Sequence, residues 1–162
     1  MLEILVVVAA WLVSMVAGLL LVFAIVVMPG IATLDDRKYL ESFTVMDRVI
    51  QDNQPIFVML WGGSILASLA AIVLSLIETE GPVRTLVVVG ATAYLLGVQL
   101  TTFLINIPLN NAVRAADLTA MDEQSLADLR SVFEPRWVRW NQVRTAVAAL
   151  ASLTLIMSVL LL

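Results

Sequence analysis

Four long apolar runs, separated by polar stretches, dominate the chain. They cover residues 4–28, 55–77, 83–107 and 135–162. About 20 apolar residues in a helix cross the hydrocarbon core of a bilayer, so each run is long enough for one span. Pro29-Gly30 ends the first run, and Pro55 suits the first turn of the second helix. We predict an all-α integral membrane four-helix bundle that forms a single domain over residues 1–162.

The first long polar stretch has an amphipathic pattern. Its polar positions recur at helical spacing: Arg37, Glu41, Thr44, Arg48 and Gln51. Its apolar positions fall on the opposite side: Tyr39, Phe43, Met46 and Ile50. The pattern predicts a short helix at the membrane surface or folded over the end of the bundle.

The stretch between the third and fourth runs predicts a second short amphipathic helix. Residues 119–122 read Thr-Ala-Met-Asp and resemble a capping box. Leu126, Leu129 and Phe133 then share one helical face. For both loop helices, a plain interfacial role is the alternative to a functional one.

Small residues form a ridge along each of the last three spans, at steps of three or four. The ridges are Gly63, Ala67, Ala71 and Ser75; Gly90, Ala93, Gly97 and Thr101; and Thr145, Ala148, Ala149 and Ser152. Because lipid supplies no hydrophobic drive between helices, close backbone approach carries more of the packing. We expect these three spans to pack tightly, and the large aliphatic first span to face lipid over much of its surface.

The basic residues predict the orientation. Those near the two long loops are Arg37, Lys38, Arg48, Arg114, Arg130, Arg136, Arg139 and Arg144, whereas the other side has only Arg84. The positive-inside rule then puts both long loops in the cytoplasm and both chain ends outside. We expect a multi-pass protein of the cell membrane, which in a bacterium is the inner membrane.

Composition narrows the chemistry. The chain is 61% hydrophobic and contains neither cysteine nor histidine, which excludes disulfides, thiol chemistry and metal sites that use those ligands. Any chemistry must then use carboxylates, amides, Arg, Tyr or Trp, or a cofactor that is held without His or Cys. The net charge of −4 argues against a nucleic-acid partner. Expected partners are membrane lipid, a lipophilic small molecule, and a second copy or another membrane protein.

Polar residues converge where the third and fourth spans meet the cytoplasmic side. Gln99, Thr102, Asn106 and Asn110 share one face of the third span, and Pro108 interrupts its backbone ladder. Trp137, Trp140, Asn141 and Arg144 share a face of the fourth. An unpaired charge at Arg144, just inside the apolar segment, would cost several kcal/mol.

Arg144 needs an acceptor, and the sequence offers several. The Asn106 and Asn110 amide oxygens, carbonyls freed near Pro108, and Asp47 all lie at the same depth. Asp47 falls on the apolar side of its amphipathic helix. An Asp47–Arg144 ion pair would explain both a carboxylate on an apolar face and an arginine inside an apolar segment. We predict a polar pocket at the cytoplasmic mouth of the bundle. The alternative is that Arg144 snorkels to the lipid headgroups, the tryptophans form an interfacial belt, and the asparagines cap helix ends.

Two motifs resemble those of a known family. Asn106-x-Pro108-x-Asn110, the Pro29 after the first span, and above all residues 137–145, Trp-Val-Arg-Trp-Asn-Gln-Val-Arg-Thr, resemble the anthrone oxygenase family of small four-helix membrane proteins. The resemblance covers nearly the whole chain. It implies a four-helix bundle and, in the fungal branch, oxidation of an anthrone to an anthraquinone by molecular oxygen without metal or flavin. On this resemblance we expect no metal and no other cofactor.

On that implication, each pocket residue has an expected role. Asp47 is the base and Arg144 stabilises the substrate anion, so both are the catalytic candidates. The substrate-binding candidates are Asn106, Asn110, Trp137, Trp140 and Asn141, with Trp140 expected to stack on the substrate rings. One alternative is a non-catalytic scaffold or quinone-binding subunit. Another is a proton-coupled transporter, but such a protein would need a carboxylate within a span, and this sequence has no obvious one.

Overall fold

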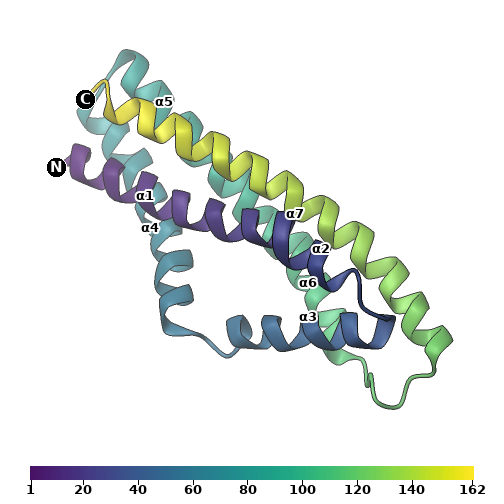
Figure 1. The fold of residues 1–162 in the computed structure, drawn as a ribbon. Coiled ribbons are helices and arrows are strands. Elements are labelled where there is room, and N and C mark those ends of the chain that lie inside the picture. Colours follow the sequence, from purple (N-terminus) through teal and green to yellow (C-terminus); the bar gives the residue numbers. More distant parts are fainter.

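The computed structural model describes residues 1–162 and is all-helical (Figure 1). The first span joins α1 (Leu2–Val22), the π-helix η1 (Phe23–Val27) and α2 (Met28–Ile31). Next come α3 (Asp36–Gln51) and α4 (Pro55–Glu78). The third span joins α5 (Gly81–Tyr94), the π-helices η2 (Leu95–Leu100) and η3 (Thr102–Asn106), and α6 (Ile107–Ala115), and α7 (Glu123–Val159) is the fourth. These four helical rods, Leu2–Ile31, Pro55–Glu78, Gly81–Ala115 and Glu123–Val159, are each long and apolar enough to cross a membrane, which confirms the predicted bundle.

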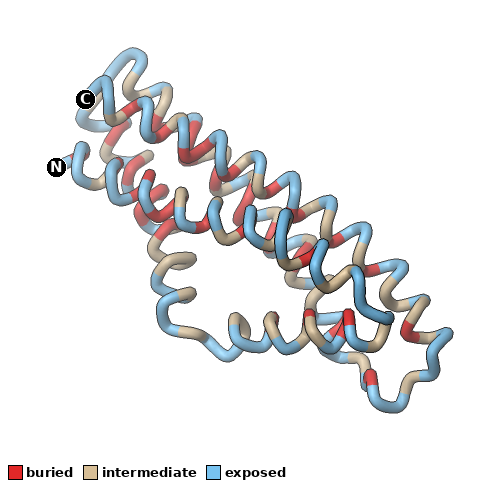
Figure 2. The backbone as a smooth tube through the Cα atoms, viewed as in Figure 1, coloured by how far each residue is buried: buried red, intermediate tan, exposed pale blue.

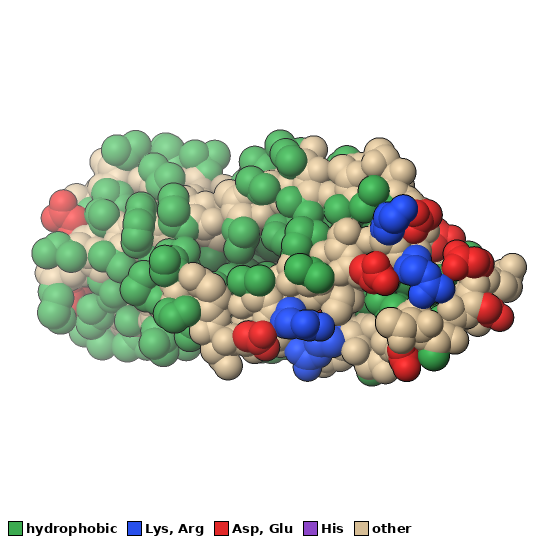
Figure 3. Space-filling model, turned by 60° about the horizontal axis from the view of Figure 1, so that its bottom comes forward, with side chains coloured by type: hydrophobic (Ala, Val, Ile, Leu, Met, Phe, Trp, Pro, Cys, Tyr) green, Lys and Arg blue, Asp and Glu red, His purple; other side chains and the backbone are tan.

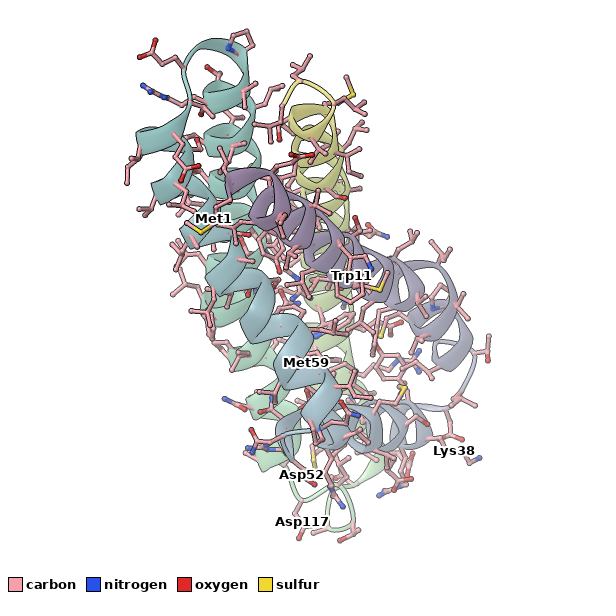
Figure 4. The ribbon with its side chains drawn as sticks, turned by 90° about the vertical axis from the view of Figure 1, so that its left-hand side faces the viewer. Met1, Trp11, Lys38, Asp52, Met59 and Asp117 are labelled. Carbon is pink, nitrogen blue, oxygen red and sulfur yellow. The ribbon has the colours of Figure 1, made fainter.

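Both chain ends lie at one end of the bundle, and both long connections lie at the other (Figure 1). Met1 marks the first end, whereas Lys38, Asp52 and Asp117 mark the second (Figure 4). Hydrophobic side chains cover most of the surface, while most charged side chains gather toward the end with the connections (Figure 3). The connections therefore share one side of the membrane.

The prediction of a separate second loop helix is wrong, because α7 runs unbroken from Glu123. Its N-cap is Asp122, whose carboxylate accepts a hydrogen bond from the Ser125 N–H at 2.8 Å, rather than Thr119. A 37-residue helix is about 55 Å long, far more than the bilayer core requires. Its first three turns therefore project beyond the membrane and pack on α3.

That packing explains why Pro135 lies inside α7 instead of starting it. An internal proline costs about 3 kcal/mol, because it removes a backbone hydrogen bond and clashes with the preceding turn. Leu126 and Phe133 are buried against α3, on either side of Arg130. The Arg130 guanidinium donates to the carbonyls of Ala32 and Leu34 and lies 4.2 Å from the Tyr39 ring centroid. These contacts offset the cost of the proline.

Two prolines follow π-helices instead of ending their spans. The residue before Pro29 donates its N–H to Phe23 O, and the residue before Pro108 donates to Thr102 O, both five residues back. The backbone thus already departs from the α-helical hydrogen-bond pattern just before each proline. The N–H that proline lacks therefore does not break a regular α-helical ladder. The first span consequently continues to Ile31, and the third to Ala115.

The first span exposes many large apolar side chains, in keeping with the expectation that it faces lipid over much of its surface, but it is also the most buried of the four spans. In its most apolar stretch 44% of the residues are buried, against 22% in α4. The buried residues of α1 form a stripe that packs against α7 and α4, and it includes Ala9, Ala10 and Val13. Buried residues line the inner faces along which α1, α5 and α7 meet (Figure 2). Its small alanines let α1 approach as closely as the ridges of the other spans do.

The small-residue ridges do mark helix contacts. A Cβ at Gly63 would lie 3.5 Å from Leu12 of α1, and one at Gly90 would lie 3.2 Å from Leu155 of α7. Gly97 is the tightest position, because its Cβ would lie 2.6 Å from the Cγ1 of Val147. Valine is stiff at χ1, so it cannot easily turn away.

Replacing Gly97 by alanine should therefore destabilise the bundle. We expect Gly97→Ala to lower the free energy of unfolding in detergent by about 1–3 kcal/mol through overpacking. Gly18→Ala is the control, since a Cβ there meets nothing within 4 Å. Adding Val147→Ala should recover part of the Gly97→Ala loss in a double-mutant cycle. Equal stability of the two alanine variants would contradict the packing described.

Candidate functional site

A cavity of about 240 Å³ lies between the helices, toward the end with the long connections. Every rod contributes to its wall, and 11 of its 19 lining residues are hydrophobic. The polar lining residues are Asp47, Gln51, Asn53, Thr102, Asn106, Asn110, Asn141 and Arg144. The structure thus brings together most of the residues that the sequence singled out.

Arg144 is the buried cation of the cavity, with only 4% of its surface exposed. One terminal nitrogen donates to Thr102 Oγ1 at 2.8 Å, and the other donates to Asn141 Oδ1 at 3.1 Å. Its Nε has no partner. The predicted Asp47–Arg144 ion pair is not formed, and no carboxylate lies within 4.0 Å of the guanidinium. Two neutral oxygens and the Trp137 ring, whose centroid lies 6.0 Å from the guanidinium carbon, are the partners of this charge.

Asn141 is fixed on both sides. Its amide nitrogen donates to the carbonyl of Leu20 at 3.1 Å, while its oxygen accepts from Arg144. Leu20 lies where α1 gives way to the π-helix that starts at Phe23. A side chain can pair with a backbone carbonyl at such a junction, where the helical ladder changes register. Asn141 therefore ties α7 and its arginine to the first span.

Asn106 is buried without any partner. It is 2% exposed, and neither its amide nitrogen nor its amide oxygen makes a hydrogen bond. It is the last residue of the π-helix η3 and lines the cavity with Arg144. An unsatisfied buried polar group costs about 1–3 kcal/mol. A free donor and a free acceptor thus face the cavity beside a positive charge.

Asp47 reaches the cavity from α3 and is 5% exposed. Its Oδ1 accepts from the Asn110 amide nitrogen at 2.8 Å, and its Oδ2 has no partner. Burial raises the pKa of the Asp47 carboxyl, an effect that the hydrogen bond from Asn110, the nearby Gln51 amide and the charge of Arg114 partly offset. A buried carboxylate with one free oxygen is suited to accept a proton.

Aromatic rings form the rest of the wall. Trp137 donates its indole N–H to Asn110 Oδ1 at 2.8 Å, and its ring packs edge-on against Phe43 at 5.4 Å. Trp61 stacks on Phe57, with ring centroids 5.3 Å apart. Trp140, the ring expected to stack on a substrate, is half-buried and does not line the cavity. Trp61 and Trp137 are the indoles that face it.

Several lining groups escaped the sequence analysis. Thr102 was placed on the polar face but not assigned to Arg144, and helical spacing was its only signal. Trp61 and Phe57 look like ordinary membrane-interface aromatics in the sequence, and the carbonyl of Leu20 has no sequence signal at all. The Leu20 carbonyl reaches Asn141 because the first span packs against α7.

No cluster of three or more carboxylate, histidine or cysteine side chains is placed to hold a metal ion. The cavity instead offers one guanidinium, carboxamides, one carboxylate and aromatic rings. Such groups can orient a planar ligand, stabilise negative charge on its oxygens and exchange a proton with it.

Comparison with known proteins identifies the family. The sequence model of the family described as anthrone oxygenase matches residues 53–154. The chain belongs to the anthrone oxygenase family. We found no significant match among curated proteins or solved structures.

The match covers only part of the cavity wall. The matched segment runs from just before α4 into α7 and contains Asn106, Asn110, Trp137, Asn141 and Arg144. Asp47 and the lining residues of α1 lie before its first residue. In this anthrone oxygenase family member, the matched helices supply the arginine and amides, while the preceding 52 residues supply the carboxylate and the opposite wall.

Two buried asparagines offer a matched test of this geometry. Without added ligand, Asn106→Leu should keep or raise the free energy of unfolding, by about 1 kcal/mol, because it removes two unsatisfied groups. Asn141→Leu should lower it by about 2–3 kcal/mol, because it leaves Arg144 and the Leu20 carbonyl without a partner. Thermal or denaturant unfolding in detergent measures both. If both variants lost stability equally, Asn106 would be part of a satisfied structural network.

Proposed function

We propose that this protein is a cofactor-free oxygenase that binds a lipophilic phenol or enol in the cavity and promotes its oxidation by molecular oxygen. The observation that carries the proposal is that Arg144 and Asn106 line the same cavity. Arg144 has no carboxylate partner, and Asn106 has no hydrogen-bond partner at all. An oxyanion of a bound ligand would supply the missing acceptor for both. Family membership and the aromatic walls support a planar aromatic ligand.

Anthrone illustrates the proposed reaction. Asp47 takes a proton from the methylene carbon of anthrone. The negative charge moves to the carbonyl oxygen of anthrone, which lies beside Arg144 and Asn106. The anion gives one electron to oxygen, and the two radicals join as a carbon-bound peroxide that takes a proton. Loss of water from this hydroperoxide leaves the anthraquinone. Anthrone and one O2 thus give anthraquinone and one water, and oxygen is the only oxidant.

The protein supplies binding, deprotonation and exclusion of water in this scheme. Arg144 holds the developing oxyanion from a dry site, where a fixed charge acts more strongly than in water. The Asn110 amide holds Asp47 in place by donating to one of its oxygens and leaves the other free. Trp61 and Trp137 offer ring faces to the substrate.

Oxygen consumption with anthrone tests the proposal. Arg144→Met and Asp47→Asn should each lower the rate by about 100-fold or more, the usual cost of losing an oxyanion donor or a general base. Arg139→Met on α7 and Asp52→Asn, directly after the end of α3, are controls at exposed positions and should stay within about twofold of the wild type. Equal rates in all five proteins would contradict the proposed roles.

The same assay has a pH dependence with a definite sign. The reaction requires ionised Asp47, so the rate should fall as the pH falls through the pKa of this carboxyl. Because burial raises that pKa, the fall should begin above the range of an ordinary aspartate, whose pKa is about 3.9. The residual rate of Asp47→Asn should lack this acidic limb.

A second candidate is a quinone-binding membrane subunit without catalysis. It is favoured by the bonds that the polar residues make among themselves, from Trp137 through Asn110 to Asp47. A wild-type protein that binds anthrone, with oxygen uptake no faster than the protein-free blank, would support this candidate over the oxygenase.

The proposed orientation follows from the basic residues at the end with the long connections. The positive-inside rule places that end, and with it the Asp47 side of the cavity, at the cytoplasmic face of a bacterial inner membrane. Both chain ends would then lie outside.

A further inference from the structure

A second hollow opens beside the cavity, between the lower halves of α1 and α4, and we call it the vestibule. Its volume is about 330 Å³, and six of its seven lining residues are hydrophobic. It shares Leu19, Phe23, Ile50 and Phe57 with the cavity, so the two spaces adjoin along these four side chains. Met46 and Val49 of α3 line the vestibule alone.

The vestibule faces the lipid. α1 and α4 touch along the half of the bundle that carries Met1, as far as Leu12 and Gly63 near mid-span, and diverge from there toward α3 (Figures 1 and 4). Val26 of η1 and Ile56 of α4, close in the chain to the lining residues Phe23 and Phe57, are each 60% exposed. Val49 itself is 57% exposed. No charged residue lines this space, and Gln54 is its single polar residue.

Polarity therefore runs in one direction through the combined space. Arg144, Asn106 and Asp47, which each carry a buried group without a hydrogen-bond partner, line the cavity, and none of them lines the vestibule. The vestibule, on the lipid-facing side of the cavity, offers an almost entirely hydrophobic lining. Ligand pockets usually measure about 300–1,000 Å³, so the cavity alone is small and the two spaces together are of ordinary size.

We propose that the ligand is an amphiphile whose acidic phenol or enol head lies at Arg144 and Asn106, and whose aliphatic tail lies in the vestibule and leads into the bilayer. The nature of the head rests on the proposed function, and the presence of a tail is the new element. The tail gains little free energy over lipid, because both surroundings are apolar. The vestibule instead acts as a steric filter, since it is the space that lets a tailed head reach Arg144.

Two probes with the same head test the tail. 2-Hydroxy-1,4-naphthoquinone is an acidic enol, and its 3-decyl derivative adds an aliphatic tail. Bound naphthoquinone beside Trp61 and Trp137 should quench tryptophan emission, which gives the Kd in lipid nanodiscs. Each Kd is expressed per concentration in the lipid phase, because the decyl chain also partitions into the bilayer. Wild type should bind both probes, and Arg144→Met should bind neither.

Variants of α3 then fill the vestibule without touching the cavity. Val49→Phe, and the double variant Met46→Phe with Val49→Phe, should weaken binding of the decyl probe by about tenfold or more. Binding of the tail-less probe should stay within about twofold. Val45→Phe is the matched control, because Val45 is one turn away, is 62% exposed and lines neither space. It should change neither affinity.

The outcomes separate this inference from the proposed function. The tail inference is overturned if wild type binds the tail-less probe but rejects the decyl probe. It is also overturned if both vestibule variants bind the decyl probe as wild type does. If wild type binds neither probe, the anion site itself is refuted, and the proposed function fails together with the tail.

Discussion

The burial of Arg144 without a carboxylate partner is the constraint on which the rest of the site depends. A buried charge is tolerated only if it is paired and hydrogen-bonded, and removing its partners costs several kcal/mol. Here the partners are the hydroxyl of Thr102 and the amide oxygen of Asn141. Asn141 in turn donates to a backbone carbonyl of the first span. The arginine therefore requires three of the four rods to meet at one depth.

The charged end of the molecule serves the same purpose. Arg130 draws the turn before α3 onto α7, and Phe43 and Phe133 pack between the two helices. This packing presses the apolar side of α3 against the bundle and carries Asp47 into the cavity on that side. The carboxylate then stands across the cavity from the arginine without neutralising it. A base and an anion-binding group in one space, unpaired with each other, remain available to a ligand.

The sequence was sufficient for the spans, because a run of apolar residues reports membrane crossing locally. It was also sufficient for the polar faces, since Asn106 and Arg144 lie on their helices at readable spacing. The sequence did not predict features that depend on how far each helix is rotated about its axis and how deep it sits in the bundle. Trp140 lies about 60° around the helix from Trp137, whereas Asn141 and Arg144 lie within about 40°, so only Trp140 falls outside the cavity. The central position of α1, and hence the acceptor for Asn141, follows from shape complementarity over many residues.

The central claim is that this cavity favours the anion of its ligand over the neutral form. The most direct measurement is an absorbance titration of anthrone under anaerobic conditions, in detergent, with and without the wild-type protein. The account predicts that binding lowers the pKa for ionisation of anthrone, and that Arg144→Met abolishes the shift. A pKa that stays unchanged or rises when anthrone binds would mean that the cavity acts as a plain apolar pocket, and would contradict the account.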